Sequence, residues 1–152
     1  MCDKLKLMYI KDLERLGADD DCPCDCCKEL PGMPCFRYMY EESITSDDFV
    51  PQVIKAERQG RAIKNYIAPI GNVCSSMGLS CYTSAQLAID NFKLKDGFPR
   101  MNPPYKHLGE CVITNDDGVV SKPSRSGHFN IHPYEGAPML TALTHHSALQ
   151  IS

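Results

Sequence analysis

Five cysteines lie within the fourteen residues from 22 to 35, and this density constrains the chain more than any other feature. They are Cys22, Cys24, Cys26, Cys27 and Cys35. Hydrophobic packing does not require so many neighbouring thiols, so the stretch is expected to bind metal, to form disulfides or to do redox chemistry. Residues 18–48 are low in aliphatic side chains and contain several acids and prolines. This composition predicts a cysteine-rich loop or knuckle that does not fold unaided.

The spacing within the cluster favours zinc. Cys24 and Cys27 are separated by two residues, which allows both thiolates to bind one ion. Cys35 follows the turn-forming pair Pro31-Gly32 and is the expected third ligand, with Cys22 or Cys26 as the fourth. Four sulfur ligands leave no open position for water, so the predicted zinc site is structural rather than catalytic.

Two alternatives to metal remain open, namely free thiols and disulfides. The chain has nine cysteines, so at least one stays unpaired in any intramolecular disulfide scheme. A reducing compartment favours metal over disulfides, and the vicinal pair Cys26-Cys27 also allows a redox sensor. The isolated Cys74, Cys81 and Cys111 are interpreted as small buried hydrophobes.

Length and charge limit the class of protein. With 152 residues, the chain is predicted to form one domain, 1–152. A formal charge of −3 with scattered Lys and Arg argues against non-specific nucleic-acid binding. The sequence contains no apolar run typical of a membrane span and no uninterrupted signal-peptide core. We therefore expect a soluble cytoplasmic protein.

The pattern of apolar residues predicts an α+β fold, a single compact domain with a small mixed or antiparallel sheet and two or three helices. Helices are expected over 3–16 and from Thr83 to the stop at Asp96-Gly97, and strands over 62–68, 78–82 and 127–132. The segment ECVIT-NDDG-VVSK predicts a hairpin. Residues 49–60 fit a helix or a strand, and the charge-free tail after Gly136 also fits either.

A second candidate site lies near the C-terminus. In the predicted strand, His128 and His132 share a face, and Glu135, the one formal charge after Arg125, follows them. These groups are candidates for acid–base catalysis, with Arg61 to hold an anion. The alternative interpretation is that this face of the strand is simply exposed to solvent.

Two functions follow from these patterns. The favoured one is a protein with a structural zinc knuckle and a binding or regulatory role, whose small-molecule or protein partner is unknown. The alternative is a small transferase or hydrolase that acts on a nucleotide-like or phosphorylated substrate through His128, His132 and Glu135. The charge-free C-terminal tail suggests a homo-oligomer contact.

Overall fold

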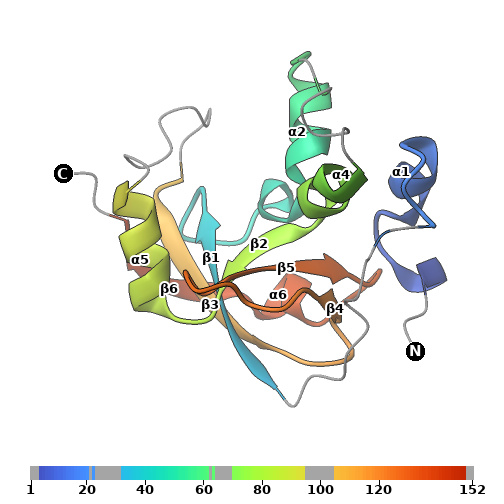
Figure 1. Ribbon diagram of the computed structural model, residues 1–152. Coiled ribbons are helices and arrows are strands. Elements are labelled where there is room, and N and C mark those ends of the chain that lie inside the picture. Colours follow the sequence, from blue (N-terminus) through green and yellow to red (C-terminus); the bar gives the residue numbers. More distant parts are fainter. Residues whose placement is uncertain are drawn as a thin grey trace.

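Six antiparallel strands form one sheet in the computed structural model, in the order β4-β5-β2-β1-β3-β6 (Figure 1). The structure describes residues 4–20, 22, 32–61, 63, 70–94 and 105–149. The strands are β1 Met33–Met39, β2 Leu79–Tyr82, β3 His107–Ile113, β4 Gly118–Val120, β5 His128–Pro133 and β6 Thr144–Ala148. The predicted α+β class is confirmed, and the sheet is antiparallel but larger than expected.

Short helices lie on both sides of this sheet, and the described segments contain more of them than predicted (Figure 1). The α-helices are α1 Ile10–Arg15, α2 Gln52–Arg58, α4 Ile70–Met77, α5 Ala85–Leu94 and α6 Met139–Ala142, with 3-10 turns η1 Lys4–Lys6 and η2 Ser46–Phe49. No helix within the described ranges has the length and apolar character needed to cross a bilayer.

The sheet is strongly bent. Only residues 114–117 join β3 to β4, although three strands separate these two in the sheet. A flat sheet would put them about 19 Å apart, whereas the link reaches about 18 Å even when fully extended. The link is not extended, because the Asp117 amide turns back to the Thr114 carbonyl at 3.0 Å. In Figure 1, β1 accordingly crosses β5 at a steep angle.

The predicted hairpin between β3 and β4 is wrong. Both strands form, but β4 pairs with β5, and β3 pairs with β1 and β6. The buried carboxylate of Asp117 explains the turn: Oδ2 accepts from the Thr114 amide at 2.8 Å, and Oδ1 accepts from the Met139 amide at 2.6 Å. These bonds hold the link against α6 and direct β4 to the far edge of the sheet.

The predicted N-terminal helix is shorter than expected. Its middle is interrupted at Leu7, which forms a bridge with Tyr134, and the Met8 amide donates to the Pro133 carbonyl at 2.8 Å. Leu7 and Leu13 are buried, but Leu5 is 82% exposed, so the apolar residues of this segment do not form one continuous buried face. Pairing with the end of β5 therefore outweighs local helix propensity.

Other elements differ from prediction in type or position. A strand, β1, lies at 33–39 inside the segment predicted as a loop, and α4 lies at 70–77, where no helix was predicted. The ambiguous segment 49–60 contains helix α2, and the tail contains both α6 and the edge strand β6. Strands were correctly predicted at β2 and β5 and a helix at α5. The strand predicted for 62–68 falls almost entirely outside the described residues.

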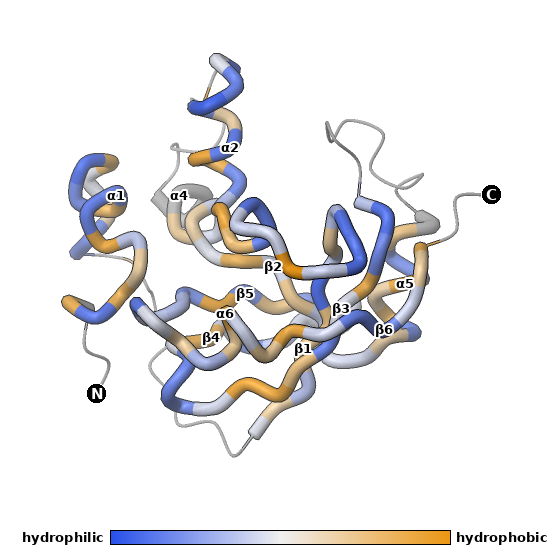
Figure 2. Tube along the Cα trace, turned by 180° about the vertical axis from the view of Figure 1, so that it is seen from behind, coloured by the Kyte–Doolittle hydropathy of each residue, from blue (hydrophilic) through white to orange (hydrophobic). Residues whose placement is uncertain are grey.

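Three apolar clusters stabilise this arrangement, and Figure 2 shows how hydrophobic positions gather where elements meet. One cluster lies between the two halves of the bent sheet and includes Phe129, Ile131 and Met139. A second holds α5 against β1 and β2 through Tyr38, Tyr82 and Phe92. The third joins α1, α2 and α4 through residues such as Leu13, Val53 and Met77, and it also contains Cys22 and Cys74.

Candidate metal centre

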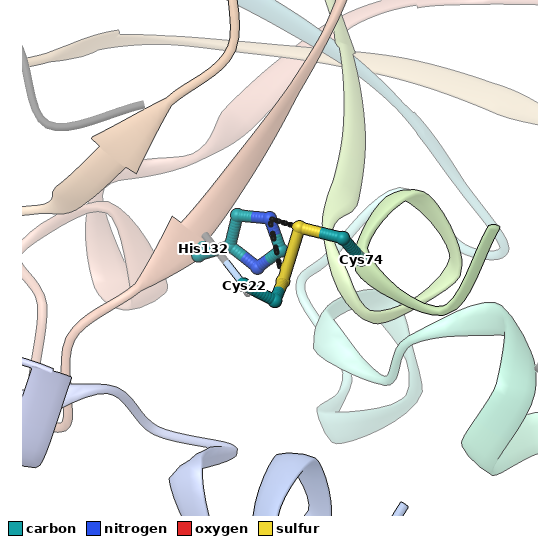
Figure 3. The surroundings of a disulfide bond; sticks show 3 residues. All are labelled: Cys22, Cys74 and His132. Atoms are coloured by element: carbon teal, nitrogen blue, oxygen red, sulfur yellow. Dashed lines mark hydrogen bonds between the residues drawn. A yellow bond between two sulfur atoms is a disulfide. The ribbon is translucent and has the colours of Figure 1, made fainter. Parts of the chain in front are cut away.

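Three side chains of types that can ligate metal, from distant parts of the sequence, meet in the interior (Figure 3). Cys22 follows α1, Cys74 lies in α4 and His132 lies in β5, and all three are buried. Their ligand atoms lie within 4.8 Å of one another. His132 Nε2 is 3.9 Å from Cys22 Sγ and 3.7 Å from Cys74 Sγ. This group could hold a metal ion.

Each ligand is positioned by a local feature of its segment. Gly17, with φ of 71°, ends α1, and the Cys22 amide then donates to the Ala18 carbonyl at 2.9 Å. Alternation along β5 puts Ile131 and His132 on opposite faces. Gly78 provides room for the imidazole: a Cβ at Gly78 would lie 3.3 Å from His132 Nε2 and 2.8 Å from Asn130 Cβ.

Cys22 and Cys74 form a disulfide in the structure, with Cα atoms 5.2 Å apart and a sequence separation of 52. The bond connects the N-terminal segment to α4. A sulfur that is bonded to another sulfur cannot act as a thiolate ligand, so the disulfide and a bound metal are alternative states of the same pair. The arrangement therefore supports both redox and metal chemistry.

The imidazole of His132 is held in the form that binds metal. Burial lowers the pKa of His132 to about 4, because an imidazolium ion would lose its hydration there. The ring therefore stays neutral at pH 7, with a lone pair available for coordination. The neighbouring cavity is mainly apolar, with Leu7, Leu13 and Met77 among its lining residues. Such surroundings limit the access of water to the site.

The structure combines one residue from each predicted site. Cys22 came from the cysteine cluster and His132 from the proposed acid–base group, whereas Cys74 was interpreted as a buried hydrophobe. Cys74 is indeed buried, but it is bonded to Cys22. The spacing between Cys22 and Cys74 forms no recognisable motif. Sequence reasoning could therefore have picked out Cys74 as a site residue only because its side chain is a thiol, which is a potential ligand.

The other predicted zinc ligands separate into two sets. Cys35 is buried in β1 opposite Cys111 of β3, and its thiol forms hydrogen bonds with Cys81 and Cys111. Cys35 therefore belongs to a different sulfur group from Cys22. Cys24, Cys26 and Cys27 lie outside the described residues.

The predicted acid–base residues have different surroundings from one another. His128 Nε2 lies 3.1 Å from Ser80 Oγ, and its ring packs edge-on against Tyr82. Glu135 and Arg61 are exposed on the surface, whereas His132 is buried with the two cysteines. Glu135 contributes its amide to the Lys6 carbonyl at 2.8 Å, and Arg61 follows α2.

Comparisons with known proteins add no family to this description: no family model, no curated protein and no solved structure matches the chain.

Proposed function

We propose that this chain is a metal-binding protein in which Cys22, Cys74 and His132 hold one zinc ion that has a structural role. The observation that carries the proposal is the convergence of these three buried ligands from three separate segments. By joining the cysteine-rich segment to the sheet, the ion stabilises a surface that serves a binding or regulatory role.

The ligand chemistry supports zinc. Two thiolates and a neutral imidazole are soft to intermediate donors, which suit zinc better than calcium or magnesium. Tetrahedral zinc with ordinary bond lengths puts sulfur and nitrogen ligands about 3.6 Å apart. The observed distances of 3.9 and 3.7 Å need to shorten by only a few tenths of an ångström. Two thiolates also neutralise the ion, which reduces the cost of burying its charge.

Zinc requires the reduced form of the pair. When the disulfide is reduced, two electrons and two protons convert it to two thiols, and zinc then displaces the protons. Tetrahedral coordination holds the sulfurs about 3.8 Å apart, beyond bonding distance. An oxidant such as glutathione disulfide would reverse the process and release the metal.

A fourth ligand is expected from the cysteine-rich segment. Cys24, Cys26 and Cys27 follow Cys22 closely in sequence, so a second thiolate from this run can reach the same ion. Three sulfurs and one nitrogen would close the coordination shell and leave no position for water, as in structural zinc sites.

Elemental analysis tests the proposal. Protein reduced and dialysed against limiting zinc should retain about one metal per chain, and cobalt substitution should produce thiolate-to-metal absorption. Cys74→Ser and His132→Ala should lose the metal, whereas Cys111→Ser, a thiol of the other sulfur group, should retain it. A reduced wild-type protein that holds no stoichiometric metal would refute the proposal.

A second candidate is the small transferase or hydrolase that acts on a phosphorylated substrate. The observation in its favour is the 3.1 Å contact between His128 Nε2 and the exposed Ser80 hydroxyl, the geometry of a base beside a nucleophile. A panel of chromogenic phosphate and carboxylate esters tests it. Turnover that disappears in both Ser80→Ala and His128→Gln would support this candidate, and turnover that persists in both would exclude the pair.

A further inference from the structure

A second site lies between β1, β2 and α2, and it carries two cations. The pocket is shallow and open: about 310 Å³ of empty space lies within it and in the solvent at its mouth. Arg37 of β1 and Lys55 of α2 line it together with Gln52, Ser80 and Tyr105. None of Cys22, Cys74 and His132 lines it, although Gly78, which lies against His132, does.

Arg37 is the central feature because its charge is buried. Its side chain is only 5% exposed, and a guanidinium group stays protonated at all physiological pH values. Its terminal nitrogens donate to the carbonyls of Ser80 and Asp48, but Nε, which is also buried, has no hydrogen-bond partner among the described residues. A buried donor without an acceptor is costly, and such a group requires an explanation.

Lys55 adds a second charge at the same pocket. Its ammonium donates to the Tyr40 hydroxyl at 2.6 Å and to the Tyr105 hydroxyl at 3.4 Å, and it also lies over both rings. Burial lowers the pKa of Lys55, because nothing in its surroundings fully replaces water. A bound anion would offset this loss.

The pocket lacks a carboxylate to neutralise these cations. Within the described part of the chain, no acidic oxygen lies within 4 Å of either Arg37 or Lys55. The buried Asp48 is nearby, but its carboxylate instead accepts from the amides of Thr45 and Tyr40, at 2.7 and 3.3 Å. The site therefore has excess positive charge and unused donors.

We propose that this pocket binds the phosphate group of a small ligand between the guanidinium of Arg37 and the ammonium of Lys55. The Nε–H of Arg37 and a remaining N–H of its neighbouring terminal nitrogen form one side of the planar guanidinium fork, which matches two phosphate oxygens, and the ammonium can reach a third. A carboxylate has only two oxygens and one charge, so it would use fewer of these donors. The enclosed space is small and open to solvent, so the phosphate would bind at the mouth of the pocket, with the rest of a larger ligand outside.

Cys81 is the one internal competitor for this role. Its sulfur lies 4.0 Å from Arg37 Nη1. Burial raises the pKa of Cys81, but the hydrogen bond from Cys35 and the charge of Arg37 outweigh burial and lower it. A Cys81 thiolate would neutralise Arg37 without a ligand. It would still leave Lys55 without a counter-charge, so the phosphate proposal explains both cations.

Titration calorimetry of the full-length wild-type protein tests the proposal at low ionic strength. The probes are inorganic phosphate and glycerol phosphate, with acetate and chloride as controls. We expect one saturable phosphate site per chain, with Kd on the order of 1 mM or tighter, and no saturation by either control. Tighter binding of glycerol phosphate would identify an organic phosphate as the ligand, and tighter binding of inorganic phosphate would identify the free ion.

Charge-removing variants locate the site. Lys55→Gln should weaken phosphate binding about tenfold, or about 1.4 kcal/mol, whereas Lys122→Gln at an exposed position should not change it. Arg37→Met should abolish binding if it folds, and Cys81→Ser should leave binding intact. The proposal is overturned if wild-type protein shows no saturable phosphate binding, or if Lys55→Gln binds as tightly as wild type. Neither the wild-type titration nor the Lys55→Gln comparison depends on whether Arg37→Met folds.

Discussion

Reduction of the Cys22–Cys74 disulfide in metal-free protein should destabilise the fold by a predictable amount. The bond closes a loop of 52 residues. In the chain-entropy model, such a cross-link removes about 14 cal/mol/K from the unfolded ensemble, which corresponds to about 4 kcal/mol at 25 °C. Because domains of this size have unfolding free energies of about 5–15 kcal/mol, the reduced, metal-free protein should be only marginally stable.

Urea unfolding followed by far-ultraviolet circular dichroism measures this loss. Samples contain a chelator and are compared with and without a phosphine reductant that does not bind metal. Wild-type protein should lose about 4 kcal/mol on reduction. Cys74→Ser should already have the lower stability and should not respond to reductant, whereas Cys111→Ser should respond like wild type because its thiol is free.

Adding zinc to the reduced protein should then restore stability. A ligand that binds only the folded state, present at about a thousand times its Kd, contributes about 4 kcal/mol, which is close to what reduction removes. The reasoning is refuted if reductant leaves the urea midpoint of wild type unchanged. It is also refuted if mass spectrometry of oxidised protein pairs Cys22 with a cysteine other than Cys74.

Three further perturbations test the neighbourhood of the centre and the turn that bends the sheet. The pKa of His132 is about 4 in the folded protein and 6.5 when unfolded, so unfolding takes up a proton between these values. The stabilisation due to neutral His132 is therefore fully present above pH 6.5 and is lost as the pH falls towards 4. Urea unfolding at each pH should show that metal-free wild type loses about 2 kcal/mol more unfolding free energy than His132→Gln between pH 7.5 and pH 5. Gly78→Ala introduces a Cβ 2.8 Å from Asn130 Cβ and 3.3 Å from His132 Nε2, so it should lower the unfolding free energy by about 1–3 kcal/mol. It should also weaken zinc binding in a competition titration, whereas Ser75→Ala on the exposed side of α4 should change neither property. Asp117→Ala removes the acceptor of two backbone amides and should cost about 3 kcal/mol in thermal unfolding, with exposed Asp116→Ala near zero.

Local sequence patterns correctly predicted those elements whose buried face is marked by apolar residues only a few positions apart. Alternation over 127–132 correctly predicted strand β5, in which Phe129 and Ile131 are buried, and helical spacing correctly predicted α5. The start of α5 was predicted one residue early: the cap is Ser84, whose hydroxyl accepts from the Leu87 amide at 3.1 Å, rather than Thr83. Patterns of this kind report which side of an element is buried, but not which element covers it.

The candidate centre shows this limit most clearly. Composition alone pointed to cysteine chemistry near Cys22 and to a functional imidazole in β5. The meeting of Cys22, Cys74 and His132 depends on tertiary structure, because loop-closure entropy disfavours each distant contact until packing of α1 and α4 against the sheet compensates for it. The same holds for β4, which pairs with β5 because the buried Asp117 redirects the chain. The sequence alone thus determined which residues carry reactive groups, and long-range packing decided which of them are neighbours.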